Sequence, residues 1–171
     1  MLCGESGTGK ALLAEAIHRA SPWAAGPFVT VDCTNIPANL MESEVFGHEP
    51  GAFTDARQRK QGLIELGAGG TVLLDEISVL PVELQAKLLG VLETRRFRRL
   101  GGTDEHETDT RFLAATNEDL MQAVEEGRFR EDLYYRLNVV PMEIPPLRDR
   151  GDDVLRIADH FLGEYTQRHG V

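Results

Sequence analysis

A glycine-rich segment near the start of the chain constrains the fold more than any other feature of the sequence. It reads Gly4-Glu5-Ser6-Gly7-Thr8-Gly9-Lys10 and fits the G-x-x-x-x-G-K pattern of a phosphate-binding loop. Its glycines can adopt positive φ and carry no side chain, so successive backbone N–H groups can converge on phosphate oxygens. Lys10 adds a positive charge. The segment therefore predicts a site for a polyphosphate.

A helix is predicted directly after this loop. Residues 11–20 are rich in good helix formers, and an apolar stripe at helical spacing is formed by Leu13, Ala16, Ile17 and Ala20. Bound phosphates would then lie at a helix N-terminus, where unpaired N–H groups and the helix dipole favour anions. The alternative is an ordinary glycine turn before a helix. We favour the phosphate site because the glycine spacing, the lysine and the helix all agree with it.

Two carboxylates that follow a predicted buried strand are candidates for metal binding and catalysis. The general pattern has Ser or Thr after the lysine to hold Mg²⁺, but this chain has Ala11 there, so the metal ligand must come from elsewhere. Residues 71–74 are mostly apolar and are followed by Asp75 and Glu76. This pattern is typical of a central parallel strand that delivers carboxylates to the edge of the sheet where the phosphate loop opens. Asp75 would hold Mg²⁺ through water, and Glu76 would polarise the water that attacks the γ-phosphate. Taken alone, the pattern also fits a strand followed by an acidic helix start.

Strands alternate with helices along the whole chain, which predicts an α/β fold with a parallel sheet. Another buried strand, residues 111–117, would bring Asn117 to the same edge as Asp75, where it can hydrogen-bond a γ-phosphate or the attacking water. A length of 171 residues indicates one domain. The other expected strands are a shortened one at residues 1–3 and runs at 28–33 and 139–144; the other expected helices are at 35–46, 61–66, 81–93, 119–127, 130–137 and 152–169.

Charge and composition argue against several classes of protein. The formal charge of −10 disfavours nonspecific binding of nucleic acid through the whole surface. The one basic cluster, residues 95–99, is followed by acidic residues, and we interpret it as a solvated strand or helix end. No apolar run reaches the roughly 20 residues of a membrane span, and the start of the chain shows no signal peptide. We therefore expect a cytoplasmic protein in which Cys3 and Cys33 are reduced.

Several segments together resemble one family, the AAA+ ATPase domain of bacterial enhancer-binding proteins, which remodel sigma-54 RNA polymerase. Besides the phosphate loop, the resemblance rests on residues 44–49, 51–54, 73–77, 114–117, 129–137 and 145–148. The Gly-Ala-Phe-Thr run at 51–54 is the most specific of them, since it resembles the loop with which the family contacts sigma-54. The resemblance implies a P-loop NTPase fold, with a three-layer α/β/α core and a mainly parallel sheet.

The resemblance also implies a role for individual residues. Lys10 would contact the β- and γ-phosphates of ATP, Asp75 would belong to the Mg²⁺ site, and Glu76 would orient the attacking water. Asn117 would be the first sensor, and Arg130 and Arg136 would be arginine fingers that reach the ATP of a neighbouring subunit. Because such an arginine is worth roughly 10³ to 10⁵ in rate, catalysis would require a ring, a hexamer in this family. The alternative for the two arginines is pairing with nearby carboxylates such as Asp132. The ATP-binding residues implied are Gly4, Glu5, Ser6, Gly7, Thr8, Gly9, Lys10 and Ala11.

Two sites depart from the family pattern. The loop that resembles the sigma-54 contact is formed by Gly51, Ala52, Phe53, Thr54, Asp55 and Ala56, and Asp55 replaces the second glycine of the family. Phe53 would supply an apolar anchor and Thr54 a hydroxyl, although a plain surface loop is the alternative. Asp32 stands where the family has an asparagine that senses nucleotide through the glutamate matching Glu76. Two facing carboxylates would repel each other, or one would take up a proton.

The function implied is that of the ATP- and Mg²⁺-dependent core of a sigma-54-dependent transcriptional activator, which remodels the holoenzyme for promoter opening. Within residues 1–171 we expect neither direct DNA binding nor a membrane segment. Most of the family's first strand, its helical lid, its receiver domain and its helix-turn-helix domain are not expected in this chain. For that reason the alternative is a nucleotide-binding or oligomer-interaction fragment that does not hydrolyse ATP. A metabolic P-loop kinase is disfavoured because nothing resembles a substrate lid.

Overall fold

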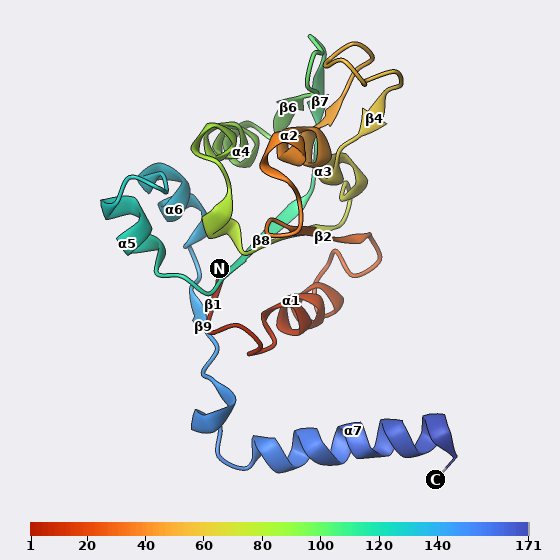
Figure 1. Ribbon diagram of the computed structural model, residues 1–171, viewed down its shortest axis with the longest axis vertical. Helices are drawn as coiled ribbons and strands as arrows, with labels where there is room; N and C mark the ends of the chain where they lie inside the picture. The colour runs from red at the N-terminus through yellow and green to blue at the C-terminus, as the bar shows by residue number, and fades with distance from the viewer. Residues whose placement is uncertain (171) are drawn as a thin grey trace.

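The computed structural model describes residues 1–170, and a five-stranded parallel sheet lies at its centre (Figure 1). The strand order is β2-β5-β8-β1-β9. Every neighbouring pair is parallel, with Asp32 opposite Asp75 and Cys3 opposite Thr116, so the carboxyl ends of the strands share one edge. The strands are β1 (Leu2–Cys3), β2 (Phe28–Asp32), β5 (Thr71–Asp75), β8 (Arg111–Thr116) and β9 (Met142–Glu143). The predicted α/β class is confirmed.

The interior strand β5, which lies between β2 and β8, is covered on both faces. Successive side chains of a strand point to opposite faces, and β5 follows this rule with Leu73 in one apolar cluster and Val72 and Leu74 in the other. All three side chains are almost fully buried. A strand with apolar residues on both faces is typical of a sheet between two helical layers. Asp75 therefore lies at the end of an interior strand, between β2 and β8.

One helix covers one face of the sheet, and several cover the other. Helix α1 (Lys10–Arg19) packs Ala14, Leu13 and Ile17 against Leu2, Leu73 and Ala115. Figure 1 shows α1 on the side of the sheet opposite to α2 and α4. The layer opposite α1 contributes the larger apolar cluster and consists of α2 (Ala38–Phe46), α3 (Leu63–Leu66), α4 (Val82–Thr94), α5 (Leu120–Glu125) and α6 (Glu131–Leu137).

Two short antiparallel hairpins extend from this layer, and the sequence did not predict their pairing. In the first, β3 (Gly47–His48) pairs with β4 (Lys60–Gln61); in the second, β6 (Arg96–Arg98) pairs with β7 (Glu105–Glu107). Leu100 joins them, because its N–H donates to Gly47 O at 2.9 Å and its carbonyl accepts from Glu49 N at 3.0 Å. The helix expected at 61–66 therefore begins only at Leu63, since Gln61 belongs to β4.

The C-terminal part of the chain differs most from expectation. The strand expected at 139–144 is reduced to β9, and Val139 and Val140 are 76% and 66% exposed. Pro141 precedes β9 and has no N–H to donate to a neighbouring strand. Beyond β9 lie the short 3₁₀ turn η2 (Leu147–Asp149) and helix α7 (Asp153–His169).

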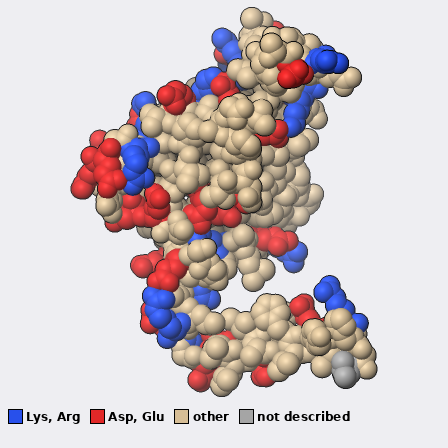
Figure 2. Space-filling model, viewed as in Figure 1, with Lys and Arg blue, Asp and Glu red and all other residues tan. Residues whose placement is uncertain are grey.

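Helix α7 is amphipathic, as predicted, but its apolar side is not covered. None of its described residues is buried, and Phe161 and Tyr165 are 61% and 60% exposed. Figure 2 shows this helix as an arm set apart from the body of the molecule. Within residues 1–170, no helix combines the length and apolar character required to cross a membrane.

Candidate active site

The glycine-rich loop connects β1 to α1 and forms an open cradle. Gly7 and Gly9 have φ of 80° and 94°, and a Cβ atom added at either would meet nothing within 4 Å. Gly9 is also the N-cap of α1, and no side chain caps the first turn. The N–H groups of this turn are consequently available to an anion. Gly4 is constrained differently, because a Cβ atom there would lie 2.6 Å from Ile144 O.

Lys10 is the buried charge at the centre of the site. Only 6% of it is exposed, and its Nζ donates to Gly4 O at 2.9 Å and to Glu5 O at 3.3 Å. The same nitrogen lies 3.2 Å from Glu76 Oε1. Lys10 therefore ties the glycine loop to the residue that follows β5.

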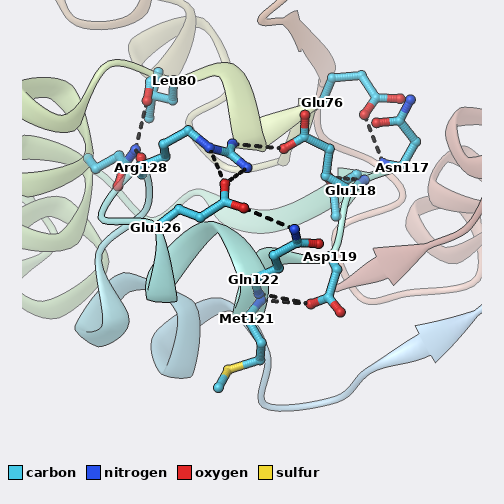
Figure 3. Close-up of polar contacts among 11 residues, drawn as sticks. Glu76, Leu80, Asn117, Glu118, Asp119, Met121, Gln122, Glu126 and Arg128 are labelled. Atoms are coloured by element: carbon cyan, nitrogen blue, oxygen red, sulfur yellow. Dashed lines mark hydrogen bonds and ion pairs between the residues drawn. The ribbon is translucent and has the colours of Figure 1, made fainter.

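Glu76 joins the ends of three strands. Its Oε1 pairs with Lys10 after β1, and its Oε2 accepts a hydrogen bond from the backbone N–H of Asn117 after β8 at 2.9 Å (Figure 3). Glu76 has φ 52° and ψ 53°, a left-handed conformation that is uncommon for a residue other than glycine. Such conformations persist only where the surroundings hold them. Here the two contacts of the carboxylate provide that support.

Asn117 takes part through its main chain rather than its side-chain amide. Figure 3 shows Glu76 directed at Asn117, with the next residue, Glu118, paired to Arg128. Arg128 also pairs with Glu126 at the end of α5. These contacts hold the segment that leaves β8 beside the site.

Asp75 lies beside Glu76 and is partly buried. Its Oδ1 accepts from the N–H of Glu76 at 3.2 Å, and its carbonyl accepts from Cys33 N at 3.1 Å. Burial, followed by the negative charge of Glu76, raises the pKa of the Asp75 carboxyl above its ordinary value. A cation at this carboxylate would relieve the unfavourable charge.

The donor set fits Mg²⁺ bound mainly through other oxygens. Residues 1–170 contain no group of three or more His, Cys, Asp or Glu side chains arranged to hold a metal. Mg²⁺ typically keeps several waters and takes one or two carboxylates together with phosphate oxygens. Asp75 beside an anion cradle matches that pattern, and Ala11 contributes no oxygen from its side chain.

The carboxylate of Asp32 is held by the turn that follows β2, and its facing of Glu76 stays a prediction. Its oxygens accept from the N–H and hydroxyl of Thr34 and from the N–H and side-chain amide of Asn35, at 2.5–3.2 Å. The hydrogen bond from the Thr34 side chain lowers the pKa of Asp32 below its ordinary value, opposite to the proton uptake that facing carboxylates would cause. The charge of Asp32 also acts on neighbouring Asp75, whose pKa it helps to raise.

The two candidate finger arginines have partners within the chain. Arg130, at the start of α6, donates to Asp132 from Nε at 3.0 Å and from Nη2 at 2.7 Å, while its backbone N–H donates to buried Gln85 at 2.8 Å. Arg136 donates to Leu92 O at 3.0 Å. The carboxylate partner considered for Arg136 therefore belongs to Arg130. Among the described contacts, neither guanidinium reaches Lys10 or Glu76.

The loop at residues 51–56 is closed by its own backbone. Gly51 N donates to Ala56 O at 2.8 Å, and Ala56 is buried. Phe53 is 37% exposed and packs edge-on against the His48 ring, with 5.0 Å between centroids. Thr54 and Asp55 are exposed at the tip. The loop thus presents a small polar and aromatic tip at the end of the first hairpin.

Arg99 departs from the solvated cluster predicted for residues 95–99, because it is buried. Arg96 and Arg98 are exposed, but Arg99 is only 5% exposed and pairs with Glu49 at 2.6 Å and Glu65 at 2.8 Å. In an extended segment, side chains two residues apart point to the same side. Arg99 is two residues after buried Phe97, so this spacing could have predicted its burial. Arg99 therefore fixes the base of the 51–56 loop to the second hairpin.

Comparison with known proteins identifies the family. Residues 1–143 match the sigma-54 interaction domain. The chain belongs to the sigma-54 interaction domain family. It is 53% identical over 169 residues to the regulatory protein AtoC of Escherichia coli K12, and the match covers 99% of this chain and 37% of AtoC. It is 50% identical over 171 residues to the nitrogen fixation protein VnfA of Azotobacter vinelandii, and the match covers 100% of this chain and 33% of VnfA. The chain thus spans about a third of these relatives.

Solved structures share the fold of this chain. NtrX from Brucella abortus in complex with ATP matches with a TM-score of 0.92 and 40% identity, over 100% of this chain and 37% of that one. The P-loop NTPase domain of an E. coli sigma-54 activator matches with a TM-score of 0.54 and 22% identity, over 85% of this chain and 82% of that one. The second match supports the fold alone.

The raised pKa of Asp75 predicts how stability depends on pH. Because the folded chain holds this proton more tightly than the unfolded chain does, stability should fall as pH rises from about 4 through the raised folded pKa. Asp75→Asn removes this loss, so the variant should be more stable than the wild type at pH 7 without nucleotide or Mg²⁺. Urea unfolding across pH measures the difference, which should shrink toward pH 4. Asp159→Asn on exposed α7 is the control. The prediction would be contradicted if the free energy of unfolding of Asp75→Asn did not exceed that of the wild type by more at pH 7 than at pH 4.

Proposed function

We propose that this chain binds ATP with Mg²⁺ and is the ATP-hydrolysing core of a sigma-54-dependent transcriptional activator. The observation that carries the proposal is the position of buried Lys10 between the open glycine cradle and the carboxylates that end β5. Membership of the sigma-54 interaction domain family and the ATP complex of NtrX support it. Residues 1–171 would form one AAA+ core domain of the activator.

The contacts of Lys10 suggest how binding prepares the site for hydrolysis. The ammonium has three N–H donors, which are directed at Gly4 O, Glu5 O and Glu76. In our proposal Lys10 turns toward the β- and γ-phosphates and loosens its contact with Glu76. Glu76, still held by Asn117 N–H, is then free to orient the attacking water. Asp75 would hold Mg²⁺ through water, and the ion would neutralise phosphate charge.

The remaining catalytic charge would come from a neighbouring subunit. Arg130 pairs with Asp132 in an exposed ion pair, and such pairs contribute little to stability, so the arginine can exchange this partner for phosphate. Arg136 would similarly release Leu92 O. An arginine supplied in trans would make hydrolysis depend on a ring, which we propose to be a hexamer.

The 51–56 loop would carry the effect of hydrolysis to sigma-54 in the RNA polymerase holoenzyme. Its tip exposes Phe53 and Thr54, and buried Arg99 anchors its base through Glu49. The excess of 28 acidic over 18 basic residues argues against direct DNA binding by this segment. We place the protein in the cytoplasm, where RNA polymerase acts.

A second candidate function is nucleotide binding or oligomer interaction without hydrolysis. One observation favours it: both candidate finger arginines have partners within the chain. Turnover of bound ATP separates the two candidates.

Replacement of Lys10 tests the nucleotide site. Lys10→Ala removes charge-assisted hydrogen bonds to phosphate, so ATP affinity should fall by at least about 100-fold. Titration with a fluorescent ATP analogue measures the change. Lys87→Ala is the matched control and should bind as the wild type does. It removes an exposed lysine of α4, in the helical layer opposite α1, where it pairs with Glu42. Equal affinity of Lys10→Ala and Lys87→Ala would refute the site.

Replacement of Thr54 tests the sigma-54 contact separately from nucleotide chemistry. Thr54→Ala removes an exposed hydroxyl at the loop tip, so sigma-54 capture should fall about tenfold or more while ATP hydrolysis stays at the wild-type level. Pull-down with purified sigma-54, together with phosphate release, measures both. Thr166→Ala on α7 serves as the control. Undiminished capture by Thr54→Ala would remove the loop from the proposal.

A further inference from the structure

The segment after β9 lies against the outer side of the phosphate loop. Ile144 N donates to Cys3 O at 2.8 Å, and Ile144 O is the atom that a Cβ at Gly4 would strike at 2.6 Å. Farther along, Arg148 in η2 pairs with Glu5, and Arg150 Nη2 donates to Thr8 O at 2.7 Å. We call residues 144–150 the linker. It contacts the loop at Gly4, Glu5 and Thr8.

The contact of Arg150 determines which way one loop peptide faces. Arg150 is itself oriented by a second bond, from Nε to Pro145 O at 2.7 Å. The described chain contains no cis peptide bond, and in a trans peptide the C=O and the following N–H point in opposite directions. Because Thr8 O points at the linker, Gly9 N–H points away from the linker. Arg150 thus orients a donor that an anion would use.

The contact of Arg148 cancels a charge within the loop. Glu5 follows Gly4 in the glycine loop and adds a carboxylate to a segment that would receive a polyanion. Arg148 binds both oxygens of that carboxylate, with Nη1 2.8 Å from Oε2. The hydrogen bond from Arg148 lowers the pKa of Glu5 below its ordinary value, as expected for a carboxylate paired with a cation.

The Glu5–Arg148 pair has little to do with folding. Its two side chains are 55% and 66% exposed, and exposed ion pairs contribute little to stability. Its effect on a nearby anion is different, because an uncompensated carboxylate repels phosphate over roughly 8–10 Å at ordinary ionic strength. The pair therefore acts mainly on ligand binding.

We propose that the linker arginines are positioning residues of the nucleotide site: Arg148 neutralises Glu5, and Arg150 orients the Thr8–Gly9 peptide toward phosphate. This inference rests on the proposed function, namely ATP binding in the cradle. It assigns the linker a direct part in affinity, in addition to connecting β9 with α7.

The charge role is tested by ATP titrations of the whole chain at low and high salt. Arg148→Ala should weaken binding about three- to tenfold at low salt, and the loss should shrink at high salt because screening weakens the exposed Glu5 charge. The double variant Arg148→Ala with Glu5→Gln should recover most of the affinity. Arg156→Ala, which removes an exposed arginine of α7, should bind as the wild type does.

The orienting role needs a second variant. Arg150→Ala should weaken ATP binding about fivefold or more at both salt concentrations, since the loss is one of geometry, and Arg150→Lys should restore part of it by donating to Thr8 O. Thermal unfolding without nucleotide checks that each variant is folded.

The outcomes separate the inference from the proposed function. Wild-type affinity in Arg148→Ala and Arg150→Ala would overturn the inference and leave ATP binding intact. Failure of the double variant to recover would overturn the charge role. Failure of the wild-type chain to bind ATP would contradict the proposed function, and the inference with it.

Discussion

The ion pair between Lys10 and Glu76 is the contact on which the site depends. It links the loop after β1 to the end of β5 while the two side chains are only 6% and 19% exposed. Removing one partner from such a pair leaves an uncompensated buried charge, which is costly. Lys10 therefore leaves Glu76 readily only when another anion takes its place. Phosphate in the glycine cradle is such an anion, so the same contact holds the resting site and makes it responsive to nucleotide.

The parallel sheet makes this contact possible. Its register places the ends of β5 and β8 at one edge, and the loop after β1 opens there as well. The surrounding contacts then hold chemically active groups that are otherwise unfavourable: a left-handed Glu76, a partly buried Asp75 with raised pKa, and glycines at positive φ. Two further arginines, from the linker, steady the outer side of the loop.

The sequence predicts this edge well because its signals are local. Glycine spacing determines where φ can be positive, and an apolar run that ends in Asp75 and Glu76 identifies a central strand. Contacts between distant segments carry no such signal, which is why the bond from Asn117 N–H to Glu76 and the pairing of Arg148 with Glu5 were not predicted. Asp32 is different. Its bonds to Thr34 and Asn35 are local turn contacts typical of aspartate, so its sequence neighbours could have indicated them.

ATP turnover per protomer, measured across protein concentration for the wild type and Glu76→Gln, tests the central claim most directly. We expect wild-type turnover to rise with concentration as neighbouring subunits supply Arg130 and Arg136. Glu76→Gln should still bind ATP but turn it over at least about 100-fold more slowly, because the amide cannot act as a base. Turnover in Glu76→Gln equal to the wild type would contradict the account, since hydrolysis would then not depend on the carboxylate that Lys10 holds.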